Sequence, residues 1–261
     1  MNPAAPLPVD VRLMHTTALV LLLTFVVLGV VTGGRWLARL PQFDIRAITV
    51  TGDVTHTNVV TLRANVAPRL SGTFFSIDLV RVRAAFEAVP WVRRAVVRRD
   101  FPNRLRVDLQ EHQAVAYWGS EGELRLINSF GEVFEANAGE VEQDMLPRLN
   151  GPEGQSADVL AMYRALEPLF EHVEIPVEQL ELSQGGSWQA RLDTGGVIEF
   201  GRGGTNDIVM RTERFLKTLT QVTSRYGRRA NAVESADLRH ENGYAIRLRG
   251  VSTQANVVPK R

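Results

Sequence analysis

Residues 90–111, PWVRRAVVRRDFPNRLRVDLQE, carry the pattern of two β-strands joined by a short turn. The first strand is expected over residues 91–99, and a turn over residues 100–103 follows it. In the second strand Leu105, Val107 and Leu109 alternate with polar residues, which is the period of a strand that buries one face. The sequence before this pair predicts what covers that face.

Three more elements are expected upstream. Residues 43–50 have alternating apolar positions and predict another strand. Residues 58–66 predict a short helix with Thr57 or Asn58 as its N-cap. Asp78 can cap a second helix that Pro90 ends. One face of this second helix is apolar and comprises Leu79, Val82, Phe86 and Val89. Residues 43–111 are thus expected to form one β-α-α-β-β module.

A long apolar segment precedes the module. No Asp, Glu, Lys or Arg lies between Arg12 and Arg35, and ~20 such residues in a helix cross a hydrocarbon core of ~30 Å. A cleaved signal peptide is one alternative, but its apolar core is usually only ~7–15 residues and ends at a small-x-small site, which this segment lacks. A buried core helix is the other alternative, but it is rarely apolar on every face. We therefore expect a transmembrane helix over residues 13–34, with residues 1–12 as a short tail, although the positive-inside rule does not decide its orientation.

The second half, residues 112–250, alternates short strands with Gly-containing turns. Helices are expected over residues 156–170 and 206–225, and paired final strands over residues 232–238 and 244–249. Residues 251–261 are polar and are expected to be a flexible tail. The predicted fold class is α+β, in which one N-terminal transmembrane helix precedes the β-α-α-β-β module and an antiparallel β-rich domain with packed helices.

Composition and motifs argue against several classes of function. Lys and Arg number 30 and Asp and Glu 29, a net charge of +1, whereas nucleic-acid binders usually carry a large basic excess. The chain has no cysteine, so disulfides, thiolate metal sites and cysteine nucleophiles are excluded. The five histidines lack metal-site spacing, and no Gly-x-Ser-x-Gly motif is present. We expect a protein that is not an enzyme, with no catalytic residues, no metal, no cofactor and no small-molecule substrate.

Several motifs carry a resemblance to known families. The start of the module, residues 43–52 (FDIRAITVTG), is similar to the start of POTRA (polypeptide-transport-associated) domains. Residues 90–92 (PWV), 101–109 (FPNRLRVDL), 146–152 (LPRLNGP) and 237–239 (DLR) resemble, in this order, the FtsQ/DivIB family of bacterial cell-division proteins. Together with the apolar segment, the resemblance covers nearly all of residues 13–250.

The resemblance implies an essential bitopic scaffold protein of the divisome, which links early and late division proteins. Residues 1–12 would be a cytoplasmic tail, 13–34 the inner-membrane anchor, 43–111 a POTRA domain and 112–250 the β domain. The bulk of the chain would lie in the periplasm, as in a single-pass type II protein, and concentrate at the division septum. The implied partners are FtsB and FtsL, and indirectly the septal peptidoglycan synthase FtsW–FtsI.

The last expected strand is the candidate binding site. If it lies at a sheet edge, its unpaired backbone groups can accept a partner strand. The resemblance implies that this edge receives a segment of FtsB, with Arg239 as a charge partner. The candidate residues are Arg239, His240, Glu241, Gly243, Tyr244, Ala245 and Ile246. His240 and Tyr244 depart from the usual family pattern, so the contact could be aromatic through Tyr244. The alternative for Arg239 is a surface ion pair within the sheet.

A cluster of arginines on the first strand of residues 90–111 is a second candidate surface. Arg93, Arg94, Arg98 and Arg99 could dock an acidic partner or anionic lipid headgroups. The alternative is a solvated outer sheet face.

Two other functions fit less well. A POTRA-bearing secretion or outer-membrane assembly factor would show several POTRA repeats or a long barrel of alternating strands. A membrane-anchored cell-wall hydrolase would need a converging set of catalytic residues. Neither feature is visible in the sequence.

Overall fold

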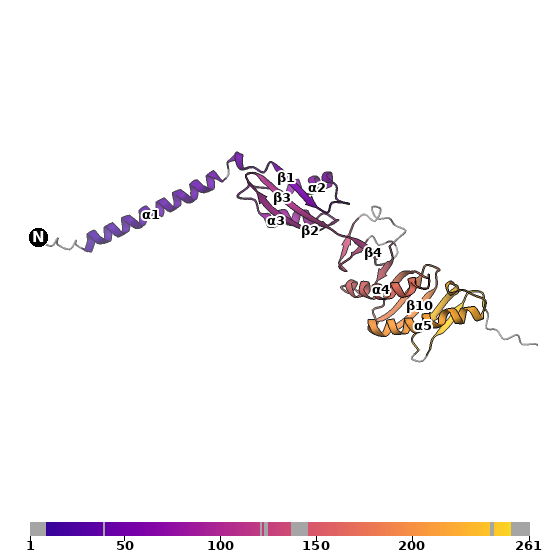
Figure 1. Ribbon diagram of the computed structural model, residues 1–261. Helices are drawn as coiled ribbons and strands as arrows, with labels where there is room; N and C mark the ends of the chain where they lie inside the picture. Colours follow the sequence, from indigo (N-terminus) through magenta and orange to yellow (C-terminus); the bar gives the residue numbers. More distant parts are fainter. Residues whose placement is uncertain are drawn as a thin grey trace, which may run out of the picture. The chain divides into compact units, whose positions relative to one another are not determined.

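The computed structural model describes residues 9–38, 40–120, 122, 125–136, 146–240 and 243–251. The chain divides into two compact units, unit 1 (residues 1–111) and unit 2 (residues 112–261) (Figure 1). Each unit has its own hydrophobic core. A single apolar helix is followed by a β-α-α-β-β module and then a β-rich part with helices, which confirms the predicted α+β class.

Unit 1 begins with α1 (Val9–Leu37), a helix of 29 residues. Within it, Leu13–Leu37 is the one candidate membrane span among the residues that the structure describes. Its apolar side chains are not covered by the rest of the protein. The hydroxyl of Thr24 donates to the carbonyl oxygen of Val20 at 2.8 Å, so the polar group is satisfied within the helix. A helix that is apolar on all faces and uncovered needs an apolar surrounding such as a bilayer.

The remainder of unit 1 is the expected module. Its elements are the short 3₁₀ helix η1 (Pro41–Phe43), β1 (Ala47–Gly52), α2 (Val59–Val66), the 3₁₀ helix η2 (Ala67–Arg69), α3 (Leu79–Glu87), β2 (Val92–Asp100) and β3 (Arg104–Glu111). The strand order is β1-β3-β2, with β1 parallel and β2 antiparallel to β3. Both helices have side-chain caps: Asn58 and Asp78 accept the N–H two residues on, at 2.8 and 2.9 Å.

The two helices cover one face of this three-stranded sheet. Leu105, Val107 and Leu109 of β3 are buried against Val82 and Phe86 of α3. The residues between them on β3 are exposed, so the predicted alternation is confirmed. The other face of the sheet is therefore open.

Unit 2 contains one nine-stranded sheet of order β12-β11-β10-β9-β8-β7-β4-β5-β6. The strands are β4 (Ala114–Trp118), β5 (Arg125–Asn128), β6 (Val133–Glu135), β7 (Arg148–Asn150), β8 (Val177–Leu182), β9 (Ser187–Leu192), β10 (Val197–Arg202), β11 (Val233–Asp237) and β12 (Ala245–Leu248). The helices are α4 (Ser156–Glu171), α5 (Thr205–Arg225) and the 3₁₀ helix η4 (Ala230–Ala232). Gly195, at φ 79°, supports the hairpin turn between β9 and β10.

The sheet of unit 2 is mixed, which corrects the expectation of an antiparallel one. Strands β7 and β8 are parallel, as are β10 and β11 and also β4 and β7. Parallel neighbours need a long crossover, and α4 joins β7 to β8 while α5 joins β10 to β11. The two helices that the sequence predicts as packed on the sheet are thus also its crossover connections.

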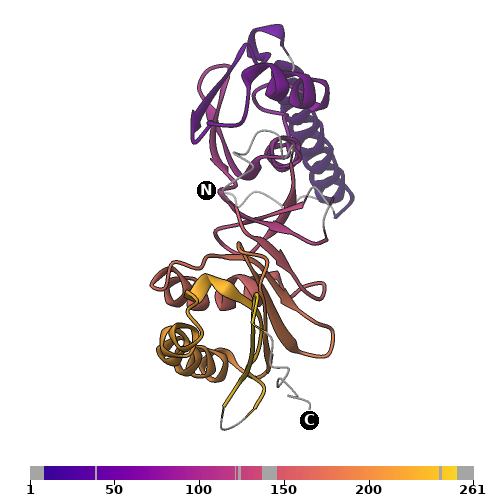
Figure 2. The ribbon, with the colours of Figure 1, turned by 90° about the vertical axis from the view of Figure 1, so that its right-hand side faces the viewer.

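Both helices pack on the same face of this sheet (Figures 1 and 2). Leu166 and Phe170 of α4 and Phe215 and Leu219 of α5 are almost fully buried in one core with the inward residues of the strands. The opposite face carries polar side chains. At one end of the sheet, α5 packs against β10, and its residues Phe215 and Thr218 contact Tyr244 just before β12.

Candidate partner-binding site

The predicted final strand lies at the edge of the large sheet. β12 pairs with β11 on one side, and no described strand lies on its other side. The pairing is antiparallel, with Ala245 opposite Asp237 and Ile246 opposite Ala236. An edge of this kind presents backbone donors and acceptors to solvent and can extend the sheet by one more strand.

The backbone groups at the open side of β12 belong to alternate residues. The N–H of Arg249 donates to the carbonyl oxygen of Ala232 at 2.8 Å, so this amide points toward the β11 side. Successive amides along a strand point in opposite directions. The amide of Ala245 therefore also points toward β11, whereas those of Ile246 and Leu248 point to the open side. A partner strand would bond to these last two residues.

Alternate side chains of β12 are held on the helix-covered face of the sheet. Leu248 is buried, and Ile246 is partly buried against the same core. Just before the strand, the Tyr244 hydroxyl lies 2.7 Å from Oγ1 of Thr218 in α5. The Tyr244 ring meets the Phe215 ring edge-on, with centroids 5.0 Å apart. Packing against α5 therefore fixes the edge strand while its backbone stays open.

Arg239 already has a carboxylate partner in its own chain. Its Nε and Nη2 donate to Oδ1 and Oδ2 of Asp237 at 2.9 and 2.6 Å, a bidentate pair. These hydrogen bonds hold the pKa of Asp237 down at about 2. The Arg239 side chain remains exposed. The structure therefore shows the ion pair within the sheet that was the alternative for Arg239. An acidic partner from another protein would have to share Arg239 with Asp237 or replace Asp237.

Gly201 positions the stem of Arg239, a role that the sequence did not reveal. The residue has φ 79° and lies at a register shift in β10. A Cβ at this position would be 2.7 Å from Cγ of Arg239. Only glycine fits both the backbone conformation and this close approach. The Gly-rich segment over residues 201–204 therefore makes room for the candidate site.

The other predicted residues of this site are His240, Glu241, Gly243 and Ala245. His240, Gly243 and Ala245 are exposed. Glu241 lies outside the described residues. The structure thus brings Arg239, Tyr244, Ala245 and Ile246 to one end of one sheet.

The four arginines of the predicted second surface do not act as one group. Arg94 and Arg98 are exposed on the open face of the unit 1 sheet. Arg93 is partly buried and donates to Gln110 at 3.4 Å. A register shift between Val92 and Arg94 interrupts the regular alternation at this point.

Arg99 is held within unit 1 and is not free to dock. Its Nε donates to the carbonyl oxygen of Phe74 at 2.7 Å, and its Nη2 donates to that of Ile77 at 2.8 Å. Both carbonyls lie in the segment that leads into α3. Arg99 therefore fixes this segment to β2.

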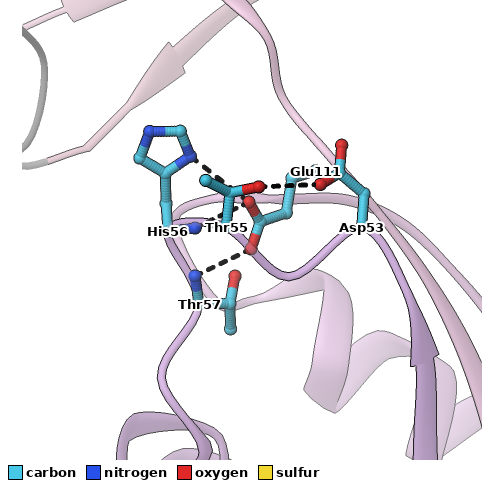
Figure 3. A network of polar contacts seen from close by, with 5 residues as sticks. All are labelled: Asp53, Thr55, His56, Thr57 and Glu111. Atoms are coloured by element: carbon cyan, nitrogen blue, oxygen red, sulfur yellow. Dashed lines mark hydrogen bonds and ion pairs between the residues drawn. The ribbon is translucent and has the colours of Figure 1, made fainter.

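A buried carboxylate at the end of β3 is a further feature that the sequence reading missed. Glu111 is only 6% exposed. Its carboxylate accepts the backbone N–H groups of His56 and Thr57 at 2.9 and 2.7 Å and lies 3.3 Å from Nδ1 of His56 (Figure 3). The His56 ring stacks on Trp91, with centroids 4.1 Å apart. The cluster fixes the loop before α2 to the last residue of unit 1.

Burial and hydrogen bonding act in opposite directions on Glu111. Burial disfavours the charged form, but hydrogen bonds from Thr57 and His56 outweigh it and lower the pKa of Glu111. No group of three or more His, Cys, Asp or Glu in the described part of the chain could hold a metal ion. The hydrogen bonds of Glu111 to His56 and Thr57 hold the loop before α2 in place.

Comparison with known proteins finds a family model that matches part of each unit. Residues 43–112 match the model of the "POTRA domain, FtsQ-type", and residues 116–239 match that of "Cell division protein FtsQ/DivIB, C-terminal". β12 lies beyond the second match.

Similar curated proteins cover the chain almost from end to end. Cell division protein FtsQ of Thiomonas arsenitoxydans is 38% identical over 255 residues, which is 96% of this chain and 93% of that protein. The proteins of the same name from Burkholderia pseudomallei and Bordetella pertussis are 38% and 35% identical over 93% and 92% of this chain and 94% and 92% of their own lengths. The apolar helix α1 and these relatives together indicate a bitopic inner-membrane protein. The chain belongs to the FtsQ/DivIB family of cell-division proteins.

Proposed function

We propose that this protein is a divisome scaffold that captures an extended segment of FtsB, in complex with FtsL, by adding it as a further strand to the open side of β12. The family supports a role in cell division. The observation that carries the binding mode is the position of β12 at the end of the nine-stranded sheet. The protein then acts by binding, with no bond-making step.

The two sides of β12 specify the chemistry of the incoming strand. On the helix-covered side, Ile246 and Tyr244 are partly buried apolar neighbours. On the other side, Arg247 and Arg249 are exposed. Arg247 lies 3.8 Å from Glu234, an exposed pair of small energetic weight. A partner strand with apolar and acidic residues in alternation fits both sides.

Such binding couples membrane anchoring to septal wall synthesis. With α1 in the inner membrane and unit 2 in the periplasm, capture of FtsB and FtsL at the septum would help control FtsW–FtsI. Residues 1–12 would then be cytoplasmic. Arg239, His240 and Gly243 would flank the added strand in this arrangement; Glu241, the remaining predicted residue, lies outside the described residues.

The test compares a variant that changes the backbone of the edge strand β12 with a control variant that changes only the side chain. Ile246→Pro removes an N–H that points to the open side, whereas Ile246→Ala removes the same packing and leaves the N–H in place. The full chain in detergent is measured against its cognate FtsB–FtsL complex. We expect Ile246→Pro to weaken binding at least about tenfold more than Ile246→Ala, which corresponds to ~1.4 kcal/mol. Equal affinities of the two variants would refute strand addition at β12.

A second measurement covers the case in which the proline disturbs β12 itself. The chain has no cysteine, so Arg247→Cys introduces a unique thiol beside the open edge. Arg191→Cys on β9 is the matched control, because Arg191 is also exposed on the same sheet but lies three strands from β12 in strand order. Crosslinks to FtsB from position 247 and none from position 191 support the proposal. Crosslinks from both positions or from 191 alone contradict it.

A further inference from the structure

The open face of the unit 1 sheet carries exposed arginines. Arg94 and Arg98 of β2 and Arg104 and Arg106 of β3 lie on the face that α2 and α3 do not cover. We call these four residues the arginine face. In the part of the chain that the structure describes, the side chains of Arg94, Arg98 and Arg104 have no hydrogen bond or ion pair, and the guanidinium of Arg106 lies 4.0 Å from the carboxylate of Asp100.

Two of these arginines face each other directly. In the β2–β3 register, Arg98 is opposite Arg106. Like charges at directly opposed positions of an antiparallel pair repel each other. The other carboxylate on this face, that of Asp108, accepts the Thr51 hydroxyl at 2.5 Å and lies across from Val96. The arginine face therefore has an excess of positive charge that the protein does not neutralise.

The chain tethers the β-α-α-β-β module of unit 1 close to the candidate membrane span. α1 ends at Leu37 and β1 begins at Ala47. Residues 38–46 can span at most ~30 Å even when fully extended, at ~3.3–3.6 Å per residue. Electrostatic attraction in physiological salt extends only ~8 Å, and a tether of this length keeps unit 1 where its charges can reach that range of the membrane surface.

We propose that the arginine face binds anionic phospholipid headgroups of the leaflet next to which unit 1 is tethered. The guanidinium fork matches a phosphodiester better than an ammonium does. Val96, between Arg94 and Arg98 on this face, is 37% exposed and can lie at the headgroup boundary. A groove of unit 1 that could receive a peptide lies elsewhere, between β1 and α2. Headgroup binding would hold unit 1 on the membrane surface.

The experiment uses the full chain reconstituted in vesicles. Val96→Cys gives a unique thiol for a fluorophore, because the chain has no cysteine. Val80→Cys on α3, which is 66% exposed, places the same label on the helix-covered side. Quenching by a headgroup-attached quencher is compared in phosphatidylcholine vesicles with and without phosphatidylglycerol, at low and high salt.

The expected result is specific to position, lipid and charge. Quenching at position 96 increases when phosphatidylglycerol is present, and high salt removes the increase, whereas quenching at position 80 does not change. Arg98→Glu/Arg106→Glu abolishes the increase. Arg81→Glu, an exposed arginine on α3, leaves it intact. If the double reversal unfolds unit 1, Arg98→Gln/Arg106→Gln carries the same expectation.

Three outcomes would overturn the proposal. One is equal quenching at position 96 with and without phosphatidylglycerol, and another is an increase that survives the loss of Arg98 and Arg106. The third is quenching at position 96 that does not respond to phosphatidylglycerol but decreases when polyglutamate is added. That result would assign the arginine face to an acidic protein. None of these outcomes bears on strand addition at β12, which lies in the other unit.

Discussion

Replacing Glu111 by glutamine removes the charge that holds the loop before α2. The carboxylate accepts two backbone N–H groups at 2.9 and 2.7 Å, and its side chain is almost fully buried. A hydrogen bond to a charged group contributes ~1.5–3 kcal/mol, against ~0.5–1.5 kcal/mol for a neutral one. Glutamine keeps one carbonyl oxygen but turns a donor toward the second N–H. We therefore expect Glu111→Gln to lower the free energy of unfolding of unit 1 by about 2 kcal/mol.

Thermal unfolding and amide exchange of the full chain measure this loss. For a folded part of this size, ~1 kcal/mol corresponds to ~4–8 °C, so the melting temperature of unit 1 should fall by about 8–16 °C. Amide exchange at Thr57 should accelerate in the same variant. Glu87→Gln is the graded control, because Glu87 accepts only one backbone N–H, from Ala95 at 3.1 Å, and is partly exposed. We expect it to have less than half the effect.

The pH dependence of the free energy of unfolding tests independently whether the charge of Glu111 stabilises unit 1. The pKa of Glu111 is lower in the folded protein than in the unfolded chain. Its contribution to stability is thus present above the unfolded value of ~4.3 and is lost as the pH falls through the folded value. The difference in stability between wild type and Glu111→Gln should shrink on acidification. A difference that stays constant from neutral pH to below the folded pKa, or an unchanged Thr57 amide, would refute this account of the cluster.

Two smaller changes probe the binding end of unit 2. Gly201→Ala imposes a side chain at φ 79° and against Cγ of Arg239; we expect a loss of ~1–3 kcal/mol in urea unfolding and a displaced Arg239, and an unperturbed Arg239 Nε resonance would contradict this. Tyr244→Phe removes the hydroxyl contact with Thr218 but keeps the ring against Phe215. Its expected cost in the same assay is ~0.5–1.5 kcal/mol, and Tyr244→Ala should cost clearly more.

Local signals in the sequence predicted the elements of this fold well. Side-chain caps at Asn58 and Asp78 and the alternation in β3 depend on neighbouring residues only, and the structure confirms them. Parallel pairing through α4 and α5 was missed, because apolar periodicity reports which face is buried and is silent on strand direction. The roles of Glu111 and Gly201 were missed for a related reason. Their partners, Thr57 and Arg239, are distant in sequence, and no periodic pattern links them.

In β2, a difference of one position along the strand decides whether an arginine side chain is held by hydrogen bonds within unit 1 or lies on the open face. Arg98 and Arg99 are adjacent in sequence and alike in chemistry. Because neighbouring residues of a strand point to opposite faces, Arg98 lies on the open face while Arg99 reaches two backbone carbonyls on the covered side. Composition could identify a basic strand, but the alternation along β2 and the hydrogen bonds of Arg99 decide which arginines remain available.

The two proposed binding surfaces also differ in which substitutions can reveal them. The arginine face would bind through side chains, so charge reversal reports it directly. The open side of β12 would bind through the amides of Ile246 and Leu248, whose side chains face the core. An alanine scan of β12 therefore measures packing against α5 and leaves the binding groups in place. For this edge, only a change in the backbone, such as Ile246→Pro against Ile246→Ala, separates strand addition from ordinary loss of stability.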